Sequence, residues 1–198
     1  SDDDQGDQGT SPVNMANFFL DNEDLQFLFN HLDLAEIAAV QEDNFTRDRG
    51  NGYEYAPVDA ADAIDNYRRV LTLVGEIAGD HIAPRAEKID HEGNRLNPDG
   101  TVTLNENVRE NLNVLAKADL MGFTLPRRYG GLNCPCLIYT MAIEIVSRAD
   151  ASLMNIFGLQ GIAETIYAFA GEDIRSEYLP RFAKGEVTGA MVLTEPDA

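Results

Sequence analysis

At 198 residues, with 44% hydrophobic and 25% charged residues, the chain has the size and composition of a globular protein with a substantial core. Its 15 basic and 34 acidic residues give a formal charge of -19, which argues against binding to nucleic acid or to an anionic membrane surface. It shows no secretory signal and no apolar run near the ~18 residues that a span requires, so we predict a cytoplasmic protein with no membrane span.

The first part of the chain divides into a tail and a helical segment. Residues 1–14 are polar and acidic, and they predict a disordered tail with little to bury. Residues 15–57 predict an N-terminal helical extension and a linker. Asp21 or Asn22 can cap a first helix, and Asp33 can cap a second, shorter one. This helical pair could bind a partner or pack onto its own domain, and packing is the commoner arrangement.

Residues 58–187 predict an all-α helical bundle. Asp59 opens the longest pattern, in which apolar residues recur at spacings of three and four, and Pro84 is expected to end or kink this helix near Ala83. Between this helix and the next, Pro98-Asp99-Gly100 predicts a turn with short extended flanks. The starts of the other predicted helices are Asn105, Cys136, Asp150, Gly161 and Asp173.

Side chains with catalytic or metal-binding chemistry form no constellation of their own. His81 and His91 lie near acidic residues, but their spacing matches no metal motif, so we expect solvated side chains and no metal. Cys134 and Cys136 are too close for an ordinary disulfide and are expected to be reduced thiols at the start of a helix.

A pair of glycines at 130 and 131 follows two basic residues. A phosphate-binding loop using Arg127 and Arg128 is conceivable, but the Gly-x-x-x-x-Gly-Lys pattern and a preceding strand are both missing. Two consecutive glycines also permit a tight backbone turn, which is the simpler interpretation.

The end of the sequence changes from helical to extended character. Gly185 can close the last helix in the left-handed conformation. Thr188 to Thr194 then predicts a strand, in which Gly189 would allow a close approach, and Pro196 ends it. The predicted fold is therefore an all-α bundle followed by residues 188–198 as the first strand of a β-domain.

Several short motifs in this order resemble the acyl-CoA dehydrogenase family, from about Asp59 to Ala198. The resemblance indicates the family's N-terminal helical domain, in the longer subgroup that carries an N-terminal extension. The motifs are Pro126-x-x-Tyr129-Gly130-Gly131, Ser147-Arg148-Ala149-Asp150, Tyr178-Leu179-Pro180-x-Phe182 and Leu193-Thr194-Glu195-Pro196.

The resemblance implies an FAD-dependent enzyme that dehydrogenates an acyl-CoA thioester at its α and β carbons. In the family, a carboxylate removes the α-proton, the β-hydride goes to flavin N5, and an electron-transfer flavoprotein takes the electrons. Such enzymes are expected to be homo-oligomers. The family's catalytic carboxylate lies further downstream, so no catalytic residue is assigned here and these 198 residues alone are expected to be inactive.

The resemblance also implies three flavin contacts at the end of the sequence. Met191 and Leu193 would present strand backbone to the flavin ring, and the Thr194 hydroxyl would lie beside N5. Without the resemblance, Thr194 would be an ordinary strand or capping threonine. Glu195 is not taken as the base, because the glutamate of this motif is structural in the family.

The helix after Asp150 matches the one that lines the acyl pocket in the family, which points to Ile156, Phe157 and Gln160 as substrate-binding residues. An apolar helix face is more often core. Two other functions stay open: a non-enzymatic interaction module that uses residues 18–40, or an acyl-chain-binding bundle that uses residues 136–170.

Overall fold

A computed structural model describes residues 16–191, and these are predominantly helical, which confirms the all-α class. A single antiparallel hairpin, β1 (Arg95–Leu96) and β2 (Val102–Thr103), is the only sheet in this part of the chain. The α-helices are α1 (Glu23–His31), α2 (Leu34–Gln41), α3 (Ala60–Ile77), α4 (Ala83–Glu92), α5 (Glu106–Lys117), α6 (Cys136–Ala149), α7 (Ala151–Gly158), α8 (Ile162–Phe169) and α9 (Glu172–Ala183).

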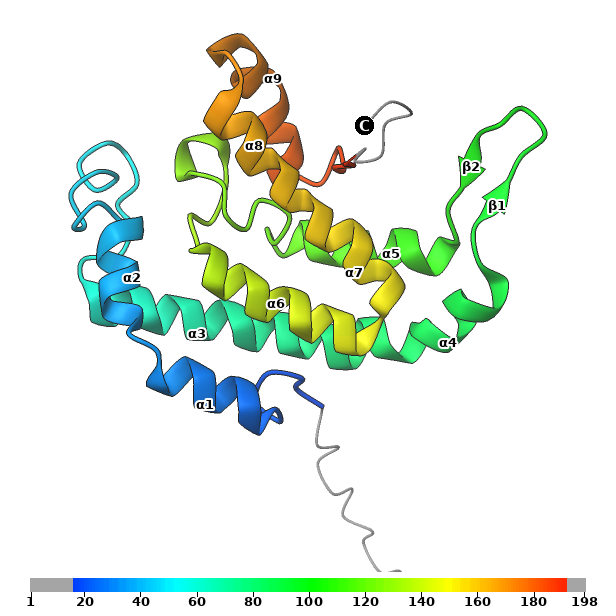
Figure 1. Cartoon of the computed structure of the whole chain (residues 1–198), viewed down its shortest axis with the longest axis horizontal. Helices are drawn as coiled ribbons and strands as arrows, with labels where there is room; N and C mark the ends of the chain where they lie inside the picture. The colour runs from blue at the N-terminus through cyan, green and yellow to red at the C-terminus, as the bar shows by residue number, and fades with distance from the viewer. Residues whose placement is uncertain (1–15, 192–198) are drawn as a thin grey trace, which may run out of the picture.

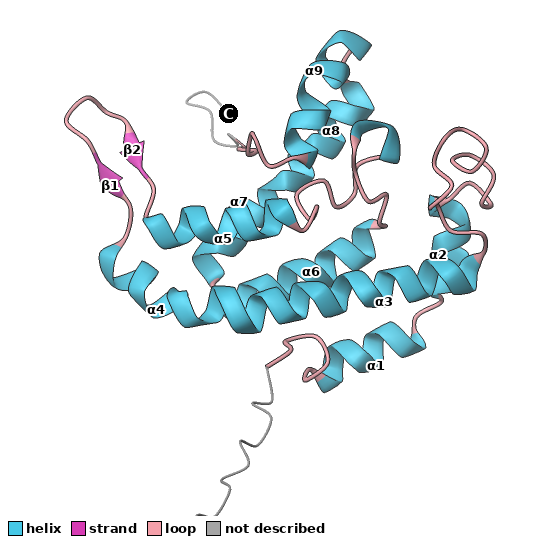
Figure 2. Cartoon of the chain, turned by 180° about the vertical axis from the view of Figure 1, so that it is seen from behind, coloured by secondary structure: helices cyan, strands magenta, loops and turns pink. Residues whose placement is uncertain are grey.

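Helices α3 and α4 form one long row that runs along the bundle (Figure 1). Helix α6 packs beside α3, α7 packs on α6, and α2 crosses the start of α3. At one end of the row the β1–β2 hairpin stands away from the helices, and at the other end α8 and α9 form a projecting pair, as the view from behind also shows (Figure 2).

Capping side chains set most of the helix starts, as the sequence predicts. Asn22, Asp59 and Asp150 each accept a hydrogen bond from a backbone N–H in the first turn of α1, α3 and α7. Asn105 does the same for α5. The start of α9 is an exception, because the helix begins at Glu172 and places Asp173 inside its first turn rather than at the cap.

Pro84 interrupts the long helix without ending it. The hydrogen-bond ladder changes to a π-helix over Ala78–Ile82, and Pro84 then occupies the first turn of α4. A proline in a first turn loses no bond, because the first N–H groups of a helix have no intrahelical acceptor. The helical path therefore continues past Ala83.

The N-terminal segment shares the core of the bundle. Residues 16–19 cross α3 where a side chain on Gly75 would collide with Asn17, and the Asn17 side-chain amide donates to the Thr72 carbonyl at 3.1 Å. Phe19 and Phe29 are buried in the same cluster as the α3 side chains. This packing fulfils the commoner of the two arrangements expected for the helical pair, while the division at residue 57 stays a prediction.

Apolar side chains form one large cluster and one small one. The large cluster joins the N-terminal segment to α3–α7 and contains most of the fully buried residues. The small cluster lies under α8 and α9, where Leu179, Phe182 and Ala163 pack against Leu125 and Tyr129 of the turn before α6. The projecting end of the molecule therefore has a thinner core than its body.

Candidate cofactor and substrate site

The chain leaves α9 through Gly185, which adopts φ +70° as expected for a residue that closes a helix. The N–H groups of Gly185 and Glu186 donate to the carbonyls of Phe182 and Arg181 at 3.0 and 2.9 Å. This closure turns the chain back toward α8. It thereby directs residues 187–191 along the start of that helix.

Gln160 holds residues 187–189 in place. Its Oε1 accepts from the Gly189 N–H at 3.2 Å, and its Nε2 lies 3.5 Å from the Val187 carbonyl. Gln160 belongs to a 3₁₀ turn, Leu159–Gly161, between α7 and α8, and its side chain is buried. A side-chain amide satisfies both a donor and an acceptor of a passing backbone, so Gln160 substitutes for the neighbouring strand that this segment lacks here.

Gly189 makes the close approach that the sequence predicts, with a neighbour inside the bundle. A Cβ at this position would collide with the Leu159 carbonyl and the Ile162 side chain. The glycine therefore allows the chain to lie directly against the start of α8. Whether it also leaves room for a flavin stays a prediction.

The three predicted flavin contacts are only partly covered by the structure. Met191 follows the Gln160-held segment and is 52% exposed. Residues 188–191 are not in a strand, because a strand is defined by pairing with a second one and no strand lies beside them in the described part of the chain. Leu193 and Thr194 lie outside the described residues.

The three predicted substrate residues separate onto different sides of α7. Phe157 is 0% exposed and packs edge-on against Phe123 and Tyr139 in the large cluster. The Tyr139 hydroxyl donates to the Phe157 carbonyl at 2.6 Å, and burial raises the pKa of this phenol well above its ordinary value. Ile156 is half-buried against the same cluster. Of the three, Gln160 is the one that contacts the predicted cofactor segment.

Arg127 has a structural role that sequence reasoning missed. Its guanidinium is buried and donates to both carboxylate oxygens of Glu42, at 2.6 and 2.7 Å, and to Asp48 at 2.7 Å. Burial opposes the charge, but these hydrogen bonds outweigh it and raise the pKa of Arg127 above its ordinary value.

This ion triad corrects the phosphate-loop interpretation of the Gly130-Gly131 turn. Arg127 is already paired, and the Arg128 guanidinium lies over the Tyr129 ring, 4.6 Å from its centroid. The turn is architectural: Gly130 has φ +84°, and a side chain on Gly131 would collide with the Leu125 carbonyl. The partners of Arg127 are some 80 positions earlier in the chain, so no local motif signals the triad.

Two further observations limit the chemistry of the described residues. Within residues 16–191, no group of three or more His, Cys, Asp or Glu side chains could hold a metal ion. None of the helices α1 to α9 combines the length and apolar character that crossing a bilayer requires.

The fold and this site define the helical domain of a flavoenzyme family. Residues 65–186 match the family model described as acyl-CoA dehydrogenase, N-terminal domain. The match covers more than half of the chain, which therefore belongs to the acyl-CoA dehydrogenase family.

Individual relatives are similar over the same region. The chain is 30% identical to the mitochondrial 2-methylacyl-CoA dehydrogenase of Solanum tuberosum over 137 residues, covering 68% of this chain and 31% of the relative. It is 28% identical to the mitochondrial isovaleryl-CoA dehydrogenase of Pongo abelii over 148 residues, covering 72% and 32%. It is 30% identical to the 3-methylmercaptopropionyl-CoA dehydrogenase of Ruegeria pomeroyi over 140 residues, covering 68% and 23%. The chain thus spans a third or less of the relatives it matches.

Proposed function

We propose that this chain is the N-terminal part of an FAD-dependent dehydrogenase that introduces an α,β double bond into an acyl-CoA thioester. Family membership supports the reaction class. The observation that carries the proposal within the structure is the pair of hydrogen bonds by which Gln160 fixes the segment that leads to Met191 and onward to Thr194. We propose that this contact positions the predicted cofactor residues beside the predicted substrate helix.

The described residues fit a flat, apolar ligand at this end of the molecule. Ile162 packs against Gly189, and Met191 follows with half of its side chain exposed. When bound, FAD would supply the acceptor for the substrate's two electrons. Met191, with Leu193 and Thr194 beyond it, would hold the flavin, while Ile156 and Gln160 would orient the acyl chain and help to exclude water.

The remaining parts of the proposal concern partners. An electron-transfer flavoprotein would reoxidise the enzyme, and the full-length protein would be a homo-oligomer. The cytoplasmic location stays a prediction, since the plant and primate relatives are named as mitochondrial. Proposed substrates are branched, short acyl-CoA thioesters of the kind named in those relatives.

An anaerobic visible spectrum of the full-length gene product tests this function. We expect a yellow protein whose flavin absorbance bleaches when isovaleryl-CoA or another saturated acyl-CoA is added. We also expect Thr194→Ala to slow the bleaching about tenfold, because one hydrogen bond near the reacting atom is worth roughly 1.4 kcal/mol.

The two other functions predict different spectra. A protein that cannot be reconstituted with FAD would contradict the proposal and favour an interaction module that uses residues 18–40. A colourless protein that nevertheless binds acyl-CoA would favour the acyl-chain-binding bundle. A yellow protein that no acyl-CoA bleaches would contradict the dehydrogenase while leaving the flavin site standing.

A further inference from the structure

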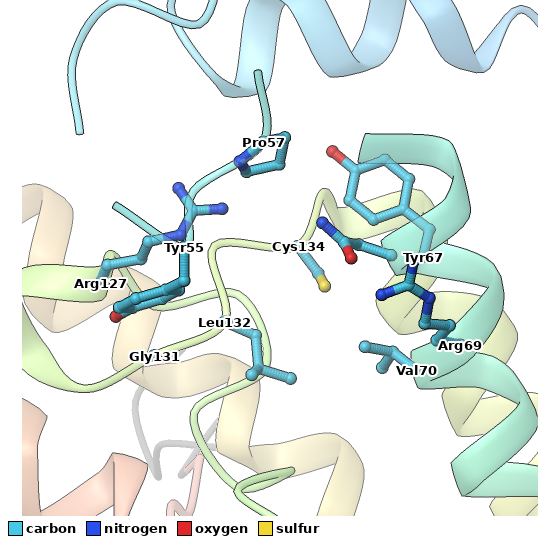
Figure 3. Close-up of a pocket in the computed structure, with 10 residues that line it drawn as sticks. Tyr55, Pro57, Tyr67, Arg69, Val70, Arg127, Gly131, Leu132 and Cys134 are labelled. Atoms are coloured by element: carbon cyan, nitrogen blue, oxygen red, sulfur yellow. The ribbon is translucent and has the colours of Figure 1, made fainter. Parts of the chain in front are cut away.

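A cleft of about 240 Å³ opens on the opposite side of the turn from the proposed flavin segment (Figure 3). It lies between α3, the loop that precedes α3, and the chain that leads into α6. None of the residues assigned to the flavin or the acyl chain lines it. Its lining includes Tyr55, Pro57, Tyr67, Val70, Leu132 and Cys134.

The polar feature of the cleft is the hydroxyl of Tyr67. Tyr67 is 3% exposed, and its hydroxyl has no hydrogen-bond partner among the described residues. In Figure 3 the ring reaches across the top of the cleft, and the hydroxyl points toward Pro57. Burial raises the pKa of Tyr67 well above its ordinary value, so the phenol stays neutral and keeps its proton to donate. An unpaired donor in a buried site favours any ligand that brings an acceptor.

The charges around the cleft are already paired. Arg127 is bound by Glu42 and Asp48, and Arg69 at the rim is bound by Asp65. The Cys134 thiol is also neutral, because complete burial raises its pKa to about 12. The cleft therefore offers no unpaired cation to select an anion. It offers apolar walls from Val70, Leu132 and Pro57 instead.

We propose that this cleft binds a small, neutral, mostly apolar molecule whose carbonyl or ether oxygen accepts the Tyr67 hydroxyl proton. Ligand clefts usually measure about 300–1,000 Å³, so this one suits a compact ligand. The inference is independent of the proposed dehydrogenase, because it uses none of that site's residues.

The probe for a direct test is prodan, a neutral naphthyl ketone whose fluorescence shifts to the blue when it leaves water. Titrated into the 198-residue protein, prodan should bind saturably with a blue shift. A naphthalene sulfonate of similar size should bind at least tenfold more weakly, because its charge would be desolvated without a partner. Equal binding of the sulfonate would overturn the assignment to neutral ligands.

Tyr67→Phe and Val70→Trp locate the probe. Tyr67→Phe keeps the ring and removes the donor, so we expect about tenfold weaker prodan binding together with an unchanged or higher melting temperature. Tyr178→Phe makes the same chemical change on α9 and should leave binding unchanged. Val70→Trp fills the cleft from its rim and should abolish binding.

Three results would overturn the proposal: no saturable binding, equal binding by the Tyr67→Phe and Tyr178→Phe variants, or binding that survives Val70→Trp. A lower melting temperature for Tyr67→Phe would also overturn it, because the hydroxyl would then be satisfied inside the protein or by ordered water. Should either variant fail to fold, the other still decides whether the probe occupies the cleft.

Discussion

Helices α6 and α8 are both strongly apolar in sequence, yet the bundle treats them differently. In α6 half of the residues are buried, and they face α3 on one side and α7 on the other. In α8 only Ala163 is buried, while Ile162 and Ile166 are half-buried and Phe169 is 85% exposed. The difference teaches that apolar sequence marks a helix as part of an interior, but only the neighbouring elements decide whether that interior is present.

The same contrast separates two kinds of attachment. The N-terminal segment is fixed by a shared core and by the buried triad of Arg127, Glu42 and Asp48. Residues 187–191 are held to α8 through Gln160 and the close contact at Gly189. The body behaves as scaffold, and the projecting end carries the predicted cofactor and substrate residues.

Truncating an aromatic residue in each region gives the largest expected difference. Phe157→Ala should lower the free energy of unfolding by about 3–5 kcal/mol, because it opens a cavity in the large cluster. Phe169→Ala should change it by less than about 0.5 kcal/mol, because the ring is exposed. Urea unfolding followed by circular dichroism measures both. Similar losses would show that α8 is packed as tightly as α7.

Breaking an ion pair in the body should cost nearly as much. Arg127→Ala leaves Glu42 buried without a partner and should destabilise the protein by about 3 kcal/mol. Arg109→Ala removes an exposed pair with Glu106 and should cost less than about 1 kcal/mol. A small effect of Arg127→Ala in the same unfolding assay would mean that the N-terminal segment does not depend on the triad.

The attachment at the projecting end is weaker. Gln160→Ala removes both hydrogen bonds to residues 187–189, so we expect a loss of about 1–2 kcal/mol and faster proteolysis near Val187. Asn155→Ala, on the exposed side of α7, is the matched control and should leave proteolysis unchanged. Equal cleavage rates in the two variants would show that Gln160 does not hold the segment.

The two thiols report the smallest effect, since labelling them leaves the fold intact. Cys136 is exposed and should react with iodoacetamide in the native protein. Cys134 is buried with its pKa raised to about 12, so it should stay unmodified until the body unfolds. Mass spectrometry after labelling distinguishes them, and native labelling of Cys134 would indicate that the body opens locally.

Local signals in the sequence predict much of this fold. Capping residues such as Asn22, Asp59 and Asp150 specify helix starts, and the Pro98-Asp99-Gly100 turn specifies the hairpin, because each effect acts within a few residues. Pro84 is harder to interpret, since a π-helix can absorb a proline and sequence alone does not announce one.

Long-range contacts escaped prediction for a physical reason. Arg127 meets Glu42 across 85 positions, and Gln160 meets Gly189 across 29, so neither pairing follows from a local pattern. The sequence did indicate Gln160, through family resemblance, as a substrate residue. The structure adds that it contacts the backbone of the predicted cofactor segment, while Phe157 belongs to the core.

Hydrogen exchange on the full-length flavoprotein, with and without isovaleryl-CoA, tests most directly whether the projecting end is the functional one. The account predicts that the acyl-CoA slows exchange in residues 156–191 and leaves α1 and α2 unchanged. Protection confined to α1 and α2, with none in residues 156–191, would contradict it and would favour an interaction module.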